Sequence, residues 1–257
     1  MTKKPKSVFN RTRTVFGKNQ YPLCRIIKNI SGKLDYVAPK LESTNINEII
    51  EEDKKYGVFN PANGEYYTYK VLNGDIELSK KETEKIIKYS HLRITRKSTI
   101  KFKPAKDGEI VDFRIEFRTV ETDPDKQLTP NTLMYHYFPI NSLTHPLRGL
   151  CVVNKDYYWT SSGKPIPLND VDPDTQFPKS TVYTYDFDQV YTHELLHGFG
   201  LPHSKEPDHM LSTNYGIMSQ YLSEQDTLRF LAKYPKREMT ESNRLRWLKW
   251  LFVASDR

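Results

Sequence analysis

Apolar and charged positions alternate most clearly at residues 111–118, where Phe113, Ile115 and Phe117 are separated by charged side chains. A period of two over this length predicts a half-buried β-strand. Shorter apolar segments at 66–71, 99–102, 133–138 and 149–153 predict four further strands. The middle of the chain is therefore expected to form a sheet.

Helix starts are marked by side chains that can cap a first turn, each followed three residues later by a second polar partner. The pairs are Ser79 with Glu82, Asp186 with Gln189, and Ser223 with Asp226. They predict helices over about 80–97, from 187 onward, and from 224 to about 234. An acidic segment at 47–55 is a further helix candidate, and residues 60–64 form a predicted turn. This order of elements indicates an α/β (α+β) fold with a mixed, twisted sheet.

The helix that begins after Asp186 carries His193, Glu194 and His197 in the pattern H-E-x-x-H. Histidines four residues apart lie on one face of a helix, one turn apart, so both imidazoles can bind one metal ion. The carboxylate of Glu194 follows the first histidine directly, within reach of a metal-bound water. The spacing therefore predicts metal-assisted hydrolysis.

Gly200 and His203 extend this pattern to H-E-x-x-H-x-x-G-x-x-H. A glycine can take a positive φ, end the helix and turn the chain back, which allows His203 to become a third ligand. Three histidines leave the fourth position of a tetrahedral zinc ion open to water, as in catalytic sites. The alternative is a helix whose histidines are merely solvated or packed.

The composition bounds the remaining possibilities. The chain has 257 residues, 37% hydrophobic and 28% charged, and no apolar run approaches the 18 residues of a transmembrane helix. Residues 1–20 lack the apolar core of a secretory signal, so we expect a protein that is cytoplasmic as synthesised or part of a particle. Cys24 and Cys151 are too few for a disulfide framework. Cys24 is either an ordinary, partly buried thiol or a thiolate that caps a zinc ion and keeps it inactive.

The net charge of +7 belongs to the two ends of the chain. Residues 1–20 contain six basic and no acidic side chains, and residues 236–257 contain six basic and three acidic ones. The first segment is either a solvated tail or a docking arm for an acidic partner. Nucleic acid is not expected, because no recognised binding motif is present. Residues 240–254 predict an amphipathic helix that packs on its own domain or on a partner or membrane surface.

The zinc motif and its surroundings resemble the matrixin branch of the metzincin zinc peptidases. The resemblance covers about residues 65–235 and includes Ser204 after the third histidine, Ile217-Met218 as the Met-turn, and Leu222-Ser223-Glu224-Gln225-Asp226 at the C-terminal helix. TYKVLN (68–73), DFRIEF (112–117) and LMYHYFP (133–139) are similar to the first, third and substrate-binding edge strands. The resemblance implies a metzincin-like domain at 64–235 between a basic N-terminal arm and extension (1–63) and a C-terminal amphipathic helix (236–257).

The resemblance implies a zinc-dependent endopeptidase that hydrolyses peptide bonds through a zinc-activated water. His193, His197 and His203 would hold one zinc ion, Glu194 would act as general base, and Met218 would lie beneath the histidines. A peptide or protein substrate would pair along the edge strand 133–138. Candidate substrate-contacting residues are Tyr135, His136, Tyr137 and Tyr221.

Several positions depart from the matrixin pattern. His136 matches one ligand of the second, structural zinc, but Val152 replaces another and the loop 122–125 has no histidine. The second zinc is therefore not expected, and His136 is predicted to be a surface or sheet histidine. Calcium could bind at Asp123, Asp125 or Asp156. Met218 lies fifteen residues after His203, a longer spacing than usual, while Met210 lies closer.

A second function remains open on the same sequence. The basic arm and the C-terminal segment are compatible with a structural or docking component of a larger assembly, such as a phage particle, that retains the metzincin fold. Chelator-sensitive cleavage of peptides favours the enzyme, and co-purification in a fixed stoichiometry without activity favours the docking module.

Overall fold

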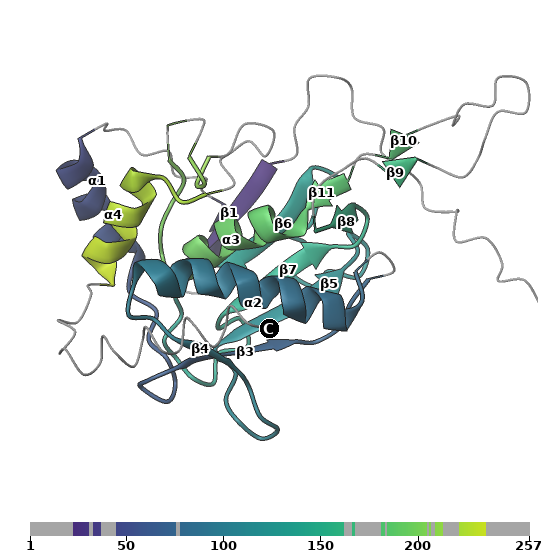
Figure 1. Cartoon of the computed structure of the whole chain (residues 1–257), viewed down its shortest axis with the longest axis horizontal. Helices are drawn as coiled ribbons and strands as arrows, with labels where there is room; N and C mark the ends of the chain where they lie inside the picture. The colour runs from purple at the N-terminus through teal and green to yellow at the C-terminus, as the bar shows by residue number, and fades with distance from the viewer. Residues whose placement is uncertain are drawn as a thin grey trace, which may run out of the picture.

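A mixed sheet with helices on one face forms the body of the protein (Figure 1). The computed structural model describes residues 45–75, 78–161, 184–204, 206, 209–212 and 221–234, and it describes the strands at 23–30, 33–36, 166–167 and 181–182 as backbone. The predicted arm at 1–20, Met218 and the C-terminal segment 236–257 lie outside these residues.

The main sheet has the strand order β2-β1-β6-β7-β5-β3-β4 in the described part of the chain. Its strands are β1 (Leu23–Ile30), β2 (Lys33–Tyr36), β3 (Tyr67–Val71), β4 (Phe102–Pro104), β5 (Phe113–Arg118), β6 (Thr132–Tyr137) and β7 (Leu150–Asn154). Strands β4, β3, β5 and β7 pair in parallel, whereas β6 pairs with β7 in antiparallel orientation. The predicted mixed sheet is confirmed.

The predicted strand at 99–102 is shifted along the chain. Ser98 accepts a hydrogen bond from the Ile100 amide at 3.2 Å, which keeps residues 98–100 in a turn after the helix. The strand β4 instead runs to Pro104 at the edge of the sheet. Proline has no amide hydrogen and is tolerated in an edge strand, where one side of the ladder needs no donor.

Strand β6 is an interior strand, and the expectation that residues 133–138 form an edge was wrong. Strand β1 pairs with β6 in parallel, with Arg25 opposite Tyr135 and Ile26 opposite His136. Strand β2 then pairs with β1 in antiparallel orientation. The sequence 23–30 carries no clear alternation, so its pairing partner could not be read from its own pattern.

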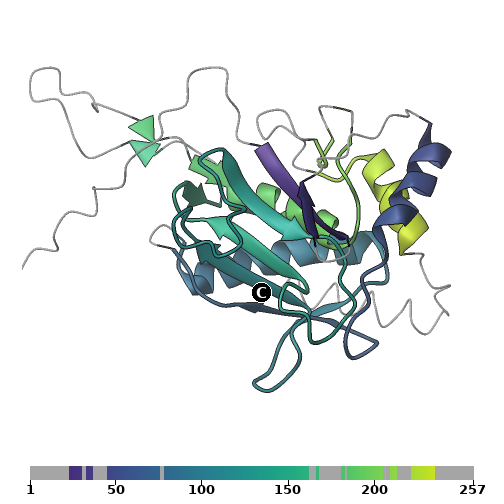
Figure 2. The ribbon, with the colours of Figure 1, turned by 180° about the vertical axis from the view of Figure 1, so that it is seen from behind.

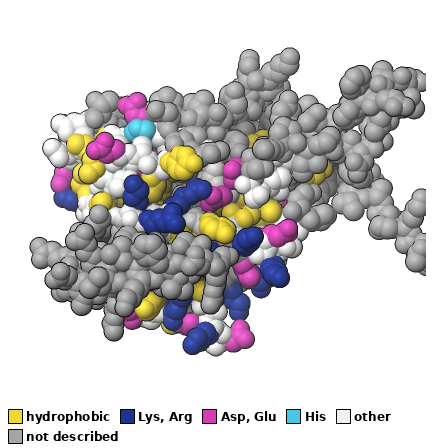
Figure 3. Space-filling model, in the orientation of Figure 1, with side chains coloured by type: hydrophobic (Ala, Val, Ile, Leu, Met, Phe, Trp, Pro, Cys, Tyr) yellow, Lys and Arg dark blue, Asp and Glu magenta, His cyan; other side chains and the backbone are white. Residues whose placement is uncertain are grey.

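Two helices, α2 (Lys80–Lys97) and α3 (Phe187–Gly198), cover one face of the sheet, and the view from behind shows the strands in front of them (Figure 2). The predicted capping box of Ser79 and Glu82 opens α2. Ile87 and Ile94 of α2 and Leu195 of α3 are fully buried against alternate residues of β5 and β7. The outer side of α2 is polar, and Figure 3 shows lysine and arginine side chains on this face of the molecule.

The opposite face of the sheet carries a smaller apolar cluster. Tyr135 and Tyr137 of β6 pack there with three aliphatic residues, Leu128, Leu150 and Val152. The Tyr135 hydroxyl donates to Asp123 at 2.9 Å, and Arg118 donates to the same carboxylate at 3.0 Å. A guanidinium therefore occupies the cationic position beside Asp123, and calcium on this carboxylate is not supported.

Helices α1 (Ile46–Asp53) and α4 (Glu224–Lys233) pack together at one end of the domain (Figure 1). Asn45 caps α1, and a 3-10 turn, η1 (Lys54–Tyr56), continues it. Ser223 and Asp226 form the predicted capping box of α4. The short strands β8 (Tyr158–Thr160) and β11 (Thr184–Asp186) pair in parallel, and β9 (Ile166–Pro167) pairs with β10 (Thr181–Val182). In the described part of the chain, no helix has the length and apolar character needed to span a bilayer.

Candidate active site

Helix α3 carries the first two histidines of the site, and it ends just before a glycine turn. The Asp186 carboxylate accepts from the Gln189 amide at 3.3 Å and starts α3, as predicted. After the last helical residue, Gly200 has φ +85° and reverses the chain. A Cβ at this position would lie 2.7 Å from the Gly57 carbonyl oxygen, so only glycine fits the turn. The reversal carries His203 back toward α3.

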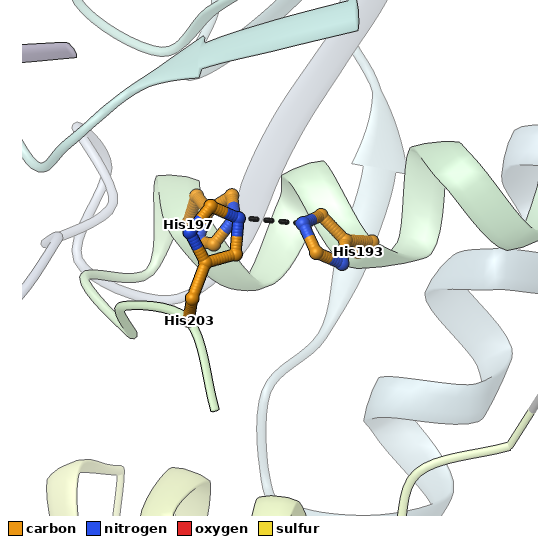
Figure 4. Close-up of side chains that lie close together, drawn as sticks. All are labelled: His193, His197 and His203. Carbon is orange, nitrogen blue, oxygen red and sulfur yellow. Dashed lines mark hydrogen bonds between the residues drawn. The ribbon is translucent and has the colours of Figure 1, made fainter. Parts of the chain in front are cut away.

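Three histidines meet beside this turn, with one ring nitrogen of each lying within 4.8 Å of the others (Figure 4). His193, His197 and His203 are at most 1% exposed. The Nε2 atoms of His193 and His197 are 2.9 Å apart, joined by the dashed line in Figure 4. The sequence prediction of a three-histidine cluster is confirmed.

Backbone carbonyls fix the orientation of two of these imidazoles. His193 Nδ1 lies 2.6 Å from the Met210 oxygen, and His197 Nδ1 lies 2.6 Å from the Leu201 oxygen. Because a carbonyl only accepts, each Nδ1 must carry the proton and each Nε2 must present a lone pair. Both ring nitrogens of His203 are buried without a hydrogen-bond partner. A cation between the rings would bind one free nitrogen of each of the three histidines, so the residues fit one zinc ion.

The buried environment keeps these imidazoles neutral. Burial lowers the pKa of His193 to about 4, against a weaker opposing effect of the Met210 carbonyl. Burial also holds the pKa values of His197 and His203 well below 6.5, and repulsion from the neighbouring histidines adds to the effect. Neutral histidine is the form that binds metal, so the ligands need no deprotonation near pH 7.

Helix α4 supports the site from behind, a contribution that sequence reasoning did not identify. The Asp226 carboxylate accepts from the Met210 amide at 3.1 Å, and the Met210 carbonyl oxygen accepts from His193 Nδ1. Asp226 was recognised only as a helix cap, because nothing in its sequence spacing connects it to residue 210. Met210 is fully buried, whereas Met218, the predicted Met-turn residue, lies outside the described residues.

The remaining predicted site residues are placed as follows. Glu194 is fully buried in α3, next in sequence to His193. His136 is 1% exposed, its Nδ1 donates to the Tyr137 carbonyl oxygen at 2.8 Å, and its ring lies against Gly198 at the end of α3. It is therefore a buried sheet histidine and not a surface one. Tyr135 and Tyr137 point into the cluster on the opposite face of the sheet.

Tyr221 precedes α4 and is 70% exposed. The Arg93 guanidinium of α2 lies 6.0 Å from the centroid of its ring. The described contacts thus place this tyrosine beside α2 and do not bring it together with the three histidines.

Two neutral imidazoles on one helix, completed by a third after a tight glycine turn, define a zinc metallopeptidase site. The matrixin family model matches residues 61–233, more than half of the chain. The chain belongs to the matrixin family of zinc metalloendopeptidases, and its buried three-histidine cluster fits one catalytic zinc ion. A search of curated proteins found no match.

Proposed function

We propose that the chain hydrolyses peptide bonds at the three-histidine cluster, with Glu194 as the general base. The observation that carries this proposal is the convergence of three buried, neutral imidazoles whose available nitrogens face one point. His193, His197 and His203 would hold the zinc ion, and the family implies peptide substrates.

A zinc ion held by these histidines would supply a Lewis acid able to polarise the scissile carbonyl and lower the pKa of the attacking water. Glu194 accepts the proton of that water and delivers it to the leaving amine. Its place immediately after His193 puts it on the same helix as two ligands. The buried surroundings exclude bulk water, which strengthens the electrostatic interactions that stabilise the developing charge.

The substrate would bind as an extended strand, because the backbone of β6 offers a ladder of amide and carbonyl groups. Strand β1 occupies that ladder. A peptide that uses β6 must therefore take the place of β1, and residues 23–30 must separate from β6 before the substrate pairs. The side chains of Tyr135 and Tyr137 remain in the cluster on the opposite face of the sheet. These two residues would contact the peptide only through their backbone amide and carbonyl groups.

The test is Glu194→Gln, which keeps the shape of the side chain and removes its basicity. A matched control is Glu84→Gln, an exposed glutamate of α2. Zinc content is measured by metal analysis and activity by cleavage of a broad peptide library. We expect Glu194→Gln to retain one zinc and lose at least about 10²-fold in kcat, a typical loss for a general base. Unchanged cleavage by the zinc-loaded variant contradicts the proposal.

The alternative role in a larger assembly was based on residues 1–20 and 236–257. Both segments lie outside the described residues, and no contact in the described part of the chain favours that role.

A further inference from the structure

The turn between the second and third histidines is held by a row of side chains. Each of four consecutive carbonyls accepts a hydrogen bond from a side chain. The Phe199 oxygen accepts from Tyr234 at 2.9 Å, the Gly200 oxygen from Lys233 at 2.6 Å, and the Pro202 oxygen from Arg229 at 2.8 Å. The fourth, at Leu201, faces the ligand His197. Three residues of α4 or its C-terminal cap thus fasten the turn that presents His203.

The two cationic residues of this set, Arg229 and Lys233, both contact Asp53 of α1. Asp53 accepts from Arg229 Nε and Nη2, each at 2.9 Å, and its backbone oxygen accepts from Lys233 Nζ at 2.6 Å. Asp53 is 2% exposed and Arg229 is fully buried. Such a bidentate pair fixes the plane of the guanidinium, and its loss leaves Arg229, among the described residues, only the longer ion pair with Asp226 at 3.9 Å. Asp53 therefore decides where Arg229 meets the Pro202 carbonyl.

The segment after Asp53 also touches the site directly. The Tyr56 and Gly57 carbonyls lie so close to Gly200 that a Cβ there would be 3.0 Å and 2.7 Å from them. Tyr56 stacks on Phe138 at 4.8 Å between ring centroids, and Phe138 meets the His197 ring edge to face at 6.2 Å. Residues 53–57 thus contact the turn at Gly200 and reach His197 through Phe138. They precede the matched family region, which begins at residue 61.

We propose that Asp53 is a positioning residue for the zinc ligands, its carboxylate acting through Arg229 on the 199–202 turn. This inference rests on zinc binding by the three histidines, which is part of the proposed function. Ordinarily, loss of an interaction that orients a metal ligand costs about 10- to 100-fold in metal affinity. Burial lowers the pKa of Lys233 to about 8, so its ammonium still donates to both carbonyls at neutral pH.

The test compares Asp53→Asn with Asp112→Asn. Asp112 forms an equally buried pair with Arg148 at 2.7 Å, but its described contacts are with the 60–68 segment and not with the 199–203 turn. Zinc affinity is measured by competition with a chromophoric chelator, and unfolding temperature is measured in excess zinc. A purely structural role predicts that both variants behave alike.

We expect both substitutions to lower the unfolding temperature and only Asp53→Asn to raise the zinc dissociation constant, by about 10-fold or more. The cobalt-substituted protein should show a changed visible absorption spectrum for Asp53→Asn alone. Equal zinc affinity in the two variants, within twofold, overturns the proposal. If Asp53→Asn does not fold, Arg229→Lys provides the test, because it keeps the positive charge and removes the bidentate pair with Asp53. None of these readouts requires peptidase activity, so loss of the proposed function would be separately visible.

Discussion

The contact between Gly198 and His136 gives a prediction whose sign depends on the background. A Cβ at residue 198 would lie 2.5 Å from His136 Cε1 and 2.7 Å from Nε2. Carbon atoms in good contact are about 3.5–4.0 Å apart, so Gly198→Ala pushes the ring back by about 1 Å. Overpacking a close-packed interior costs about 1–3 kcal/mol. The better helix propensity of alanine offsets about 0.5–1 kcal/mol of this.

We therefore expect Gly198→Ala to lower the free energy of unfolding by about 0.5–2 kcal/mol in the natural sequence. In a His136→Ala background the obstacle is gone, and the same substitution should raise it by about 0.5–1 kcal/mol. The four proteins of this double-mutant cycle are compared by denaturant unfolding in excess zinc. A Gly198→Ala effect of the same sign and size in both backgrounds refutes the contact.

Three further outcomes are expected. Burial lowers the pKa of His91 to about 3, so between pH 6.5 and 3 the unfolded chain binds a proton that the folded protein excludes. Stability should thus fall by about 2 kcal/mol from pH 7 to pH 5 through this residue alone, and His91→Phe should remove that part of the slope in denaturant titrations. Asp123→Asn should lower the free energy of unfolding by about 3 kcal/mol in the same assay, because the buried carboxylate pairs with Arg118; a loss below about 0.5 kcal/mol contradicts this pairing. Removing residues 1–44 should raise kcat/KM for peptides, and an unchanged value shows that β1 does not compete with substrate.

Local signals in the sequence predicted the elements that depend on local physics. The side chains of Ser79, Asp186 and Ser223 begin helices where the capping pattern placed them, because a cap needs only a partner two or three residues away. The zinc helix and the turn at Gly200 follow the same logic. The motif predicts both within eleven residues, although the side chains that hold the turn come from α4 and its C-terminal cap.

Contacts between distant segments were not predictable in this way. Asp53 meets Arg229 across 176 positions, and neither residue stands out from the other charged side chains of the chain. Burial of the His136 ring, which lies against Gly198, likewise lowers the pKa of this histidine to about 4, and no sequence spacing reveals that burial. Strand β1 pairs through its backbone, and backbone groups are identical in every sequence. These features require the tertiary arrangement.

If the substrate pairs along β6 as proposed, the pairing of β1 with β6 places a competitor for it on the same chain. Residues 37–45 connect the β1–β2 hairpin to α1, so β1 is presented to β6 as part of the same molecule. A tethered segment has an effective concentration on the order of millimolar, whatever the dilution of the protein. The apparent association constant for a free peptide equals its intrinsic value multiplied by the fraction of time for which β1 is away from β6. On that mode of binding, the protein would set its own substrate threshold, and a change in the length of the segment between β2 and α1 would move that threshold without altering a residue at the zinc site.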